Sequence, residues 1–201
     1  GVEVWGLHRR TSTPNFLNIQ HLLGTKNFNL IEGDLTDLSS LISIINRVEP
    51  DCIYNLASQS FVPTSWTQPI FTAQATGVGA LHIFEAARIV NPKIKIYQAS
   101  SSEMFGTSTT PTQDENTPLL PNSPYGSAKI FAHHTAKNYR EAHDMFISCG
   151  ILFNHESPRR GENFISRKTI IGIIKVLRGQ QKCLFLGNLD SKRDWGHAKE
   201  F

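Results

Sequence analysis

The chain has 201 residues, a formal net charge of +3 and 39% hydrophobic residues, enough for one large domain or for one domain and part of another. So small a charge, with no block of like charge, gives no argument for a nucleic-acid or membrane partner. No apolar run approaches the roughly 20 residues that span a bilayer, and no signal peptide is evident. We therefore expect a protein of the reducing cytoplasm that binds neither nucleic acid nor membranes.

The chain opens at Gly1 without an initiator methionine, and the run from Val2 to Leu7 already reads as a buried strand. We therefore expect the sequence to be the middle part of a longer protein. Three cysteines, Cys52, Cys149 and Cys183, lie far apart, and each stands within an apolar run. This pattern predicts buried free thiols rather than disulfides or a metal site.

Strands and helices alternate along the chain. Short apolar runs predict strands over residues 2–8, 28–32, 52–56, 94–99, 146–152 and 182–186. Helical periodicity predicts helices over residues 38–48, 71–90, 125–143 and 165–177, with Thr36 as the N-cap of the first. Because each strand is a continuous apolar run, we predict an α/β fold with a parallel sheet covered on both faces.

Polar clusters follow four of the predicted strands. They are Arg9-Arg10, Asp34-Leu35, Ala57 to Ser60 and Ser100 to Glu103. Ligands of such sheets bind at the carboxyl ends of the strands, so the clusters predict a single binding edge. A glycine-rich turn that would cradle a pyrophosphate at a helix N-terminus is absent from these residues.

Tyr125 and Lys129 stand four residues apart on a predicted helix and so share one face. A nearby ammonium group lowers the pKa of a phenol, which is otherwise about 10, and lets the tyrosine take a proton from a sugar hydroxyl. The pair could also be an ordinary exposed helix pair. The serine-rich strand end that precedes it, closed by Glu103, favours catalysis.

The character of the sequence changes after Leu152. This stretch, which begins with a polar loop over residues 153–161, carries Arg159, Arg160, Lys168 and Arg193, and the guanidinium fork is suited to phosphate groups. We predict a boundary between residues 1–152 and 153–201, and a phosphorylated or nucleotide-linked substrate.

Four segments carry a resemblance to a known family. They are Gln98-Ala-Ser-Ser-Ser-Glu-Met-Phe-Gly106, Ser123-Pro-Tyr-Gly126 with Lys129, Asn154-His-Glu-Ser-Pro-Arg-Arg-Gly161 and Lys192-Arg-Asp-Trp-Gly-His197. With them the whole chain resembles the extended short-chain dehydrogenases/reductases and, among these, the GDP-mannose 4,6-dehydratases. The resemblance implies a Rossmann-type, doubly wound parallel sheet that binds NADP in residues 1–152, its first strand and glycine-rich loop lacking. It implies part of a smaller substrate-binding region in residues 153–201.

The resemblance also implies a reaction, the conversion of GDP-mannose to GDP-4-keto-6-deoxymannose and water through internal hydride transfer from C4 to C6. Tyr125 would deprotonate the C4 hydroxyl, Ser101 would hydrogen-bond the same oxygen, and Lys129 would tune the tyrosine and hold the nicotinamide ribose. Glu103 would remove the C5 proton and assist loss of the C6 hydroxyl. It would distinguish a dehydratase from an epimerase, although such a carboxylate could instead cap a turn.

An acidic residue after the second strand of this fold would hold the ribose 2′-hydroxyl of NAD, whereas Arg9 and Arg10 suit the 2′-phosphate of NADP; a solvated basic loop is the alternative. The resemblance adds cofactor contacts at Asp34, Leu35, Leu56, Ala57, Ser58, Gln59, Ser60, Lys129, His155 and Arg160. It places substrate contacts at Asn154, Lys168, Gly187 and Arg193. His155 could instead be structural, and Phe71 is left out because some relatives carry a tyrosine there.

Two other interpretations remain open: another nucleotide-sugar dehydratase or epimerase of the same fold, and a folded but inactive fragment. If the polypeptide begins at Gly1, we expect negligible NADP binding, because the diphosphate-binding turn is lacking. The family commonly forms dimers or tetramers, so the resemblance implies a homodimer or homotetramer. No metal is expected.

Overall fold

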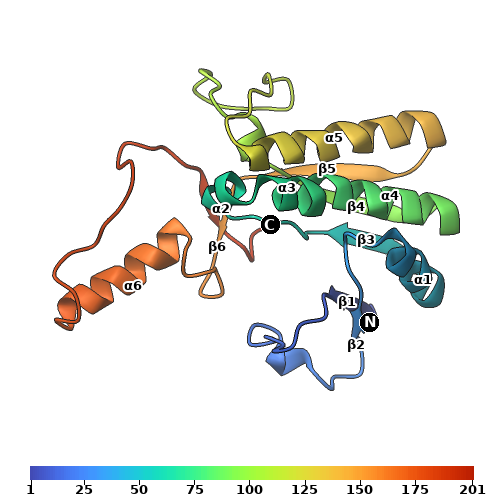
Figure 1. Ribbon diagram of the computed structural model, residues 1–201, viewed down its shortest axis with the longest axis horizontal. Helices are drawn as coiled ribbons and strands as arrows, with labels where there is room; N and C mark the ends of the chain where they lie inside the picture. Colours follow the sequence, from blue (N-terminus) through green and yellow to red (C-terminus); the bar gives the residue numbers. More distant parts are fainter. The chain divides into compact units, whose positions relative to one another are not determined.

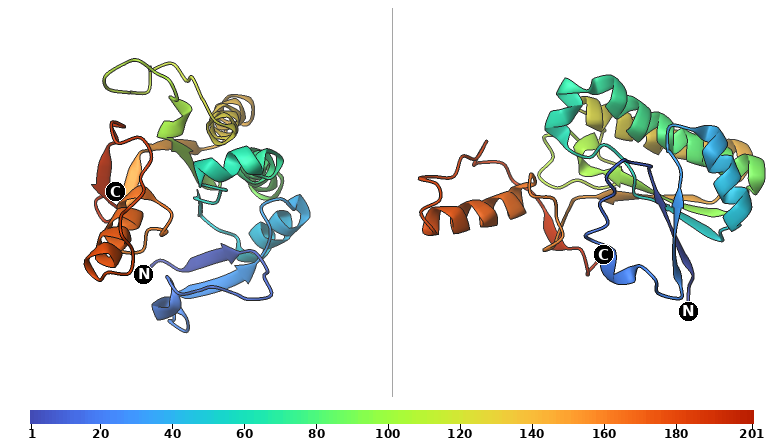
Figure 2. Two further views of the ribbon diagram at one scale, coloured as in Figure 1. Left: turned by 60° about the vertical axis from the view of Figure 1, so that its left-hand side comes forward. Right: turned by 60° about the horizontal axis from the view of Figure 1, so that its bottom comes forward.

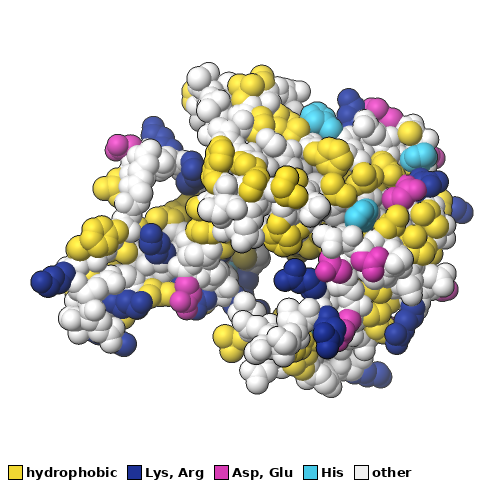
Figure 3. All heavy atoms as spheres, in the orientation of Figure 1, with side chains coloured by type: hydrophobic (Ala, Val, Ile, Leu, Met, Phe, Trp, Pro, Cys, Tyr) yellow, Lys and Arg dark blue, Asp and Glu magenta, His cyan; other side chains and the backbone are white.

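A computed structural model describes residues 1–201. The chain forms two compact units, Gly1–Ile151 and Leu152–Phe201, whose elements are labelled in Figure 1. The C-terminal unit holds ten of the chain's 20 basic residues but only five of its 17 acidic ones. On the face drawn in Figure 3, its visible charges are mostly basic, while acidic and basic side chains are mixed over the N-terminal unit.

The N-terminal unit contains strands β1 (Val4–His8), β2 (Phe28–Glu32), β3 (Cys52–Asn55), β4 (Lys95–Ser101) and β5 (Ile147–Leu152), the last ending at the unit boundary. Its helices are α1 (Leu38–Val48), α2 (Val62–Thr67), α3 (Pro69–Thr72), α4 (Gly79–Val90) and α5 (Pro124–His143). Shorter turns are η1 (Gln20–Leu22), the π-helical η2 (Ala73–Val78) and η3 (Ser102–Met104). All five strands predicted before residue 153 are confirmed, with ends that shift by one or two residues.

The strands form two separate pieces of sheet. β1 pairs in parallel with β2, with Val4 opposite Phe28, and the second piece has the order β3-β4-β5. β3 and β4 are parallel, with Cys52 opposite Lys95. β1 and β3 are not hydrogen-bonded to each other, and the apolar side chains of Val4 and Leu7 are 48% and 41% exposed.

Helices α1, α4 and α5 lie over one face of the three-stranded sheet (Figure 2). The core between them is built from Leu41 and Ile45 of α1, Phe84 of α4 and Ile96 of β4, all at most 6% exposed. Small residues, including Ala132 on α5 and Ala80 on α4, let the helices approach closely. The opposite face carries Tyr54, which is 70% exposed. The α/β class is thus confirmed for part of a domain.

Two local expectations need correction. Asp37, not Thr36, is the N-cap of α1, since its carboxylate accepts from the Ser39 amide at 3.0 Å. The helix expected over residues 71–90 begins earlier, at Pro69, and contains the π-helical turn η2. Within η2, a Cβ at Gly77 would lie 3.2 Å from the Phe131 ring, so glycine permits the close approach of α5.

The C-terminal unit contains β6 (Asn154–Glu156), α6 (Ile165–Leu177) and β7 (Trp195–His197). β6 and β7 pair in parallel, with Asn154 opposite Trp195. The helix prediction over residues 165–177 is confirmed. The strand prediction over residues 182–186 is wrong, because Leu184 packs on Gly172 of α6 instead of joining a sheet. The β6 segment had been expected to be a loop.

All three cysteines are free, as predicted, but the prediction that they are buried is wrong. Cys52 and Cys183 are exposed, and Cys149 is half-buried. Cys52 and Tyr54 are two residues apart on β3, so their side chains lie on the same, exposed face of the sheet. Nowhere in the chain does a helix have the length and apolar character needed to cross a membrane. No group of three or more potential metal ligands lies together.

Candidate active site

A cavity of about 310 Å³ lies at the carboxyl ends of β1, β2 and β3 in the N-terminal unit. It is lined by Leu7, Arg9, Gly33, Asp34, Leu35, Thr36, Ala57, Ser58, Gln59, Phe71 and Ala75. Three polar clusters that are distant in sequence therefore meet here, as the strand-end argument predicts. Arg10, Leu56 and Ser60 are not among the lining residues. Phe71, which the sequence argument set aside, is.

The turn after β2 is fixed by Asp34. Its carboxylate accepts from the Thr36 amide at 2.8 Å and from the Thr36 hydroxyl at 2.7 Å. These two hydrogen bonds lower the pKa of Asp34, and the charge of Arg9 adds to the effect. Gly33 is required just before this turn, because a Cβ there would lie 2.7 Å from a methyl group of Leu7. The turn therefore presents an ionised carboxylate at the cavity wall.

Leu35 is held from behind by α4. The ring of His82 is hydrogen-bonded through Nδ1 to the Leu35 carbonyl at 2.9 Å. A Cβ at Gly79 would lie 2.6 Å from Leu35 Cγ, so only glycine leaves room for this side chain. Neither His82 nor Gly79 was predicted to belong to the site. Both are far from Leu35 in the sequence, and only the fold brings them into contact with it.

The side chain of Gln59 shapes the loop after β3. Its Nε2 donates to Thr72 Oγ1 at 3.1 Å and to the Phe61 carbonyl at 3.2 Å, and its Oε1 accepts from the Phe61 amide at 2.8 Å. The backbone N–H of Gln59 donates to Thr76 Oγ1 in η2 at 3.2 Å. Because its side chain and its backbone N–H are both engaged within the protein, Gln59 fixes the shape of this loop.

The end of β4 is organised by Ser101 and Gly126. Ser101 is the N-cap of η3, and its hydroxyl accepts from the Glu103 amide at 3.2 Å. A Cβ at Gly126 would lie 2.6 Å from the Glu103 carbonyl oxygen, so the start of α5 packs directly on η3. Tyr125, only 7% exposed, precedes this contact. The N-cap of η3 is therefore Ser101.

Lys129 lies on the same side of α5 as Tyr125 and is 3% exposed. Its Nζ donates to the Ala99 carbonyl at 2.8 Å and lies 5.8 Å from the centroid of the Tyr125 ring. Burial lowers the pKa of Lys129 to about 8. The predicted pairing of a phenol with a buried amine is therefore present.

His133 continues the same column on α5, four residues beyond Lys129. Its Nδ1 is hydrogen-bonded to the Ser100 hydroxyl at 2.8 Å, and burial lowers its pKa. It is absent from the residues predicted from the sequence, although the repeated spacing of four was a usable signal. A larger cavity of about 400 Å³ beside His133 and Cys149 contains none of the predicted catalytic residues.

In the C-terminal unit, β6 carries Asn154 and His155. The His155 ring is hydrogen-bonded to the Phe153 carbonyl at 3.2 Å, and its centroid lies 3.9 Å from that of Phe201. The guanidinium carbon of Arg160 lies 3.7 Å from the Phe164 ring centroid. Arg160 and Asn154 both contact the carboxylate of Glu156.

The other predicted substrate residues are not part of this cluster. Lys168 lies in the first turns of α6, where its amide donates to the Phe164 carbonyl at 2.8 Å. Gly187 and Arg193 lie in the loop between α6 and β7, and Arg193 Nη1 donates to the neighbouring Lys192 carbonyl at 3.0 Å.

A model of the family described as GDP-mannose 4,6 dehydratase matches residues 1–201. The chain belongs to this family. It is 46% identical over 208 residues to the GDP-mannose 4,6-dehydratase of Vibrio cholerae serotype O1 and 47% identical over 210 residues to that of Homo sapiens. Each alignment covers 100% of this chain but 56% of the relative. The chain thus spans about half the length of these dehydratases.

Solved structures support the fold. A dTDP-glucose 4,6-dehydratase, DesIV from Streptomyces venezuelae with NAD and TYD bound, matches with a TM-score of 0.86 at 21% identity, over 98% of this chain and 59% of that one. RMD from Pseudomonas aeruginosa, complexed with NADPH, matches with a TM-score of 0.78 at 22% identity, over 91% and 65%. These likenesses establish a Rossmann-type fold for this member of the dehydratase family.

Proposed function

We propose that the protein is an NADP-dependent GDP-mannose 4,6-dehydratase that converts GDP-mannose to GDP-4-keto-6-deoxymannose and water. The observation that carries the proposal is the arrangement at the end of β4. Buried Tyr125 and Lys129 share one side of α5, and Gly126 brings the start of that helix onto the backbone of Glu103. Family membership supplies the substrate class.

The first chemical role falls to Tyr125, which would take the proton of the C4 hydroxyl as hydride leaves C4. Lys129 supports it, because a buried ammonium 5.8 Å from the ring favours the phenolate. Its pKa of about 8 lets it gain and lose a proton close to neutral pH. The Ala99 carbonyl fixes the Lys129 amine at 2.8 Å.

Glu103 supplies the second role. A ketone at C4 acidifies the C5 proton, and a carboxylate can remove it and then donate a proton to the departing C6 hydroxyl. Ser101 holds η3 at the end of β4, so Glu103 is presented from a fixed backbone. Bound NADP would supply the oxidation and reduction by accepting hydride from C4 and returning it at C6.

The residues at the 310 Å³ cavity fit the adenosine end of a dinucleotide. Arg9 is the basic residue on its wall, which favours the 2′-phosphate of NADP over the free hydroxyl of NAD. Asp34 and Leu35 are suited to the adenine, and the loop formed by Ala57, Ser58 and Gln59 to the ribose and diphosphate. Arg10, outside the lining, remains a proposed neighbour of the phosphate.

We also propose that two copies of the chain associate through α2, α3 and α5. Trp66, Ile70 and Phe131 on these helices are 63%, 70% and 46% exposed. Monomeric proteins rarely expose large apolar side chains together, so this exposure favours an interface. The three free cysteines accord with a cytoplasmic location.

The proposal is tested by incubating the full-length gene product with GDP-mannose and NADP. We expect a 4-keto-6-deoxy sugar nucleotide, detected by mass loss of one water. A C4 epimer formed without water loss would favour the epimerase alternative. Conversion of dTDP-glucose but not of GDP-mannose would favour a dehydratase for another nucleotide.

A further inference from the structure

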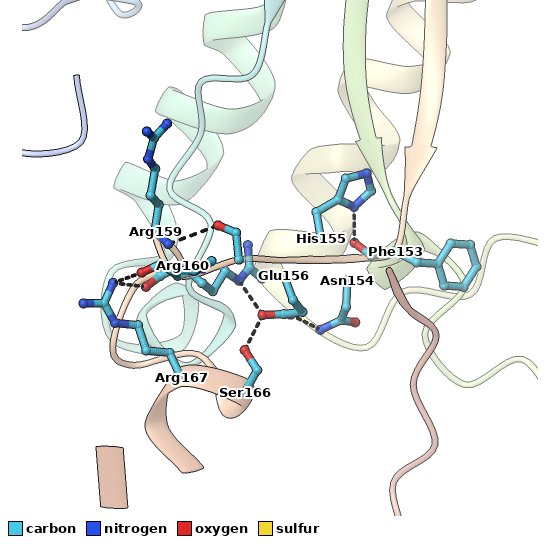
Figure 4. Close-up of polar contacts among 10 residues, drawn as sticks. Phe153, Asn154, His155, Glu156, Arg159, Arg160, Ser166 and Arg167 are labelled. Carbon is cyan, nitrogen blue, oxygen red and sulfur yellow. Dashed lines mark hydrogen bonds and ion pairs between the residues drawn. The ribbon is translucent and has the colours of Figure 1, made fainter. Parts of the chain in front are cut away.

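The carboxylate of Glu156, the last residue of β6, forms two hydrogen bonds and one ion pair with three other side chains (Figure 4). Asn154 Nδ2 donates to its Oε1 at 3.3 Å, and the Ser166 hydroxyl donates to its Oε2. Arg160 Nε lies 3.6 Å from the same Oε2. The Glu156 side chain is only 15% exposed. One carboxylate, partly buried, therefore joins β6, the loop after it and the start of α6.

Arg160 depends on this carboxylate for its orientation. Its Nε is buried and has no hydrogen-bond partner, so the charge of Glu156 is the polar attraction acting on that atom. On the other side, the guanidinium carbon lies 3.7 Å from the centroid of the Phe164 ring. A guanidinium held between a ring and a carboxylate is restricted in rotation before any ligand binds, which lowers the entropy lost on binding.

The loop that carries Arg160 is braced separately. Arg167 Nη1 donates to the carbonyl oxygens of Pro158 and Arg160, both at 2.8 Å. Ser166 stands in the first turn of α6, whose N-cap residue Phe164 makes no side-chain hydrogen bond to the helix. The Ser166 bond to Glu156 is thus the side-chain link between this helix start and β6.

We propose that Glu156 is a positioning residue for ligand binding, which holds two side chains in one fixed relation: Arg160, the expected cofactor contact, and Asn154, the expected substrate contact. The inference rests on the proposed function for the identity of both ligands. Glu156 itself is poorly suited to contact the phosphate groups of either ligand, because a carboxylate only accepts hydrogen bonds and repels phosphate. Two hydrogen bonds, from Asn154 and Ser166, and the ion pair with Arg160 engage its carboxylate within the protein, so it acts through Arg160 and Asn154.

The test compares Glu156→Gln with Glu162→Gln in the full-length gene product. Glu162 lies in the same loop, but its carboxylate is 72% exposed and pairs with Arg167 at 3.5 Å. For Glu156→Gln we expect the Kd for NADP and the KM for GDP-mannose each to rise about tenfold, with kcat at saturation within about twofold. Glu162→Gln should leave all three unchanged. Unchanged NADP and GDP-mannose affinity in Glu156→Gln would overturn the proposal.

A double-mutant cycle separates positioning from a general loss of structure. If Glu156 acts through Arg160, Glu156→Gln adds no further increase in the NADP Kd once Arg160 is changed to alanine. If Glu156→Gln raises the NADP Kd by the same factor with Arg160 present and with Arg160→Ala, Glu156 does not act through Arg160. If Glu156→Gln does not fold, Ser166→Ala decides, because it removes one bond and keeps the charge. We then expect a rise of about threefold in the NADP Kd, and no change would overturn the proposal.

Failure of the two proposals can be told apart. NADP binding is measured by titration without sugar nucleotide, so the Glu156 result does not depend on turnover. If the wild-type protein binds NADP but releases no 4-keto product, the proposed reaction is contradicted. The NADP titrations would still decide the role of Glu156.

Discussion

Lys129 is a buried cation whose amine bonds a carbonyl and not a carboxylate. Burial lowers its pKa from 10.5 to about 8, so between these values the unfolded chain binds more protons than the folded one. The contribution of this residue to the free energy of unfolding therefore rises as the pH increases from 8 to 10.5. Below pH 8 its full destabilising effect remains, which is consistent with a residue kept for chemistry.

We predict that Lys129→Met is more stable than the wild type at pH 7, by up to about 3 kcal/mol less the lost hydrogen bond, and nearly inactive. The gain should shrink as the pH rises through 8 toward 10.5 and vanish above it, where the wild-type lysine is neutral in both states. Denaturant unfolding at pH 7 and pH 10 measures the difference. A variant less stable than the wild type at pH 7 would show that the amine stabilises the fold.

Residues of the candidate site could be predicted where local sequence spacing or a position at a strand end indicates their role. The Tyr125 and Lys129 pair follows from helical spacing, and the strand-end rule brings Arg9, Asp34 and Ala57 to one cavity. His82, Gly79 and Thr76 could not be found in this way, because each acts on a residue from another element.

Helices α4 and α5 are joined by a polar network at the end remote from Tyr125. Arg88 donates to both oxygens of Glu85 at 2.8 and 2.6 Å, and the Tyr139 hydroxyl donates to Glu85 Oε2 at 2.8 Å. Hydrogen bonds from Arg88 and then Tyr139 lower the pKa of Glu85 to about 2. Burial and the bond to Glu85 raise the pKa of Tyr139 to about 12.

We predict that Glu85→Gln lowers the free energy of unfolding by about 1 kcal/mol at pH 7, the typical net value of a protein hydrogen bond. In the wild type, the Glu85 contribution is complete above pH 4.5 and is lost as the pH falls toward 2. The Tyr139 contribution is complete below pH 10 and is lost as the pH rises toward 12. Unfolding curves across pH measure both.

The matched control is Glu141→Gln on α5, where the carboxylate is 65% exposed and lies 3.8 Å from Lys137. Exposed pairs contribute little, so this variant should match the wild type at every pH. Equal effects of the two substitutions would contradict the account of the Glu85 network.

Elements were predicted well where an apolar pattern is long. The 13 residues of α6 were placed from their periodicity, whereas β6 and β7 have three residues each and little apolar character. The run 182–186 looked like a strand, yet Leu184 serves to cover Gly172. The π-helical turn η2 depends on packing against α5 and has no signature in its sequence.

At the scale of the whole molecule, the exposed apolar groups of α2, α3 and α5 predict self-association. We expect the full-length gene product to elute as a dimer or tetramer, and Ile70→Glu, which places a charge at a side chain 70% exposed, to shift it toward the monomer. Light scattering with chromatography measures the mass. Tyr54→Glu, also 70% exposed but on the opposite face of the sheet, is the control. A wild-type monomer would refute the proposed interface.

Glu103 is proposed to remove the C5 proton of the sugar, and this step is visible as hydrogen exchange between C5 and the solvent. In D₂O, the wild-type protein should place deuterium at C5 of the 4-keto-6-deoxy product. Glu103→Gln should bind NADP with unchanged Kd but show neither exchange at C5 nor loss of water, with turnover reduced by at least about 100-fold. Exchange and water loss at the wild-type rate in this variant would contradict the account.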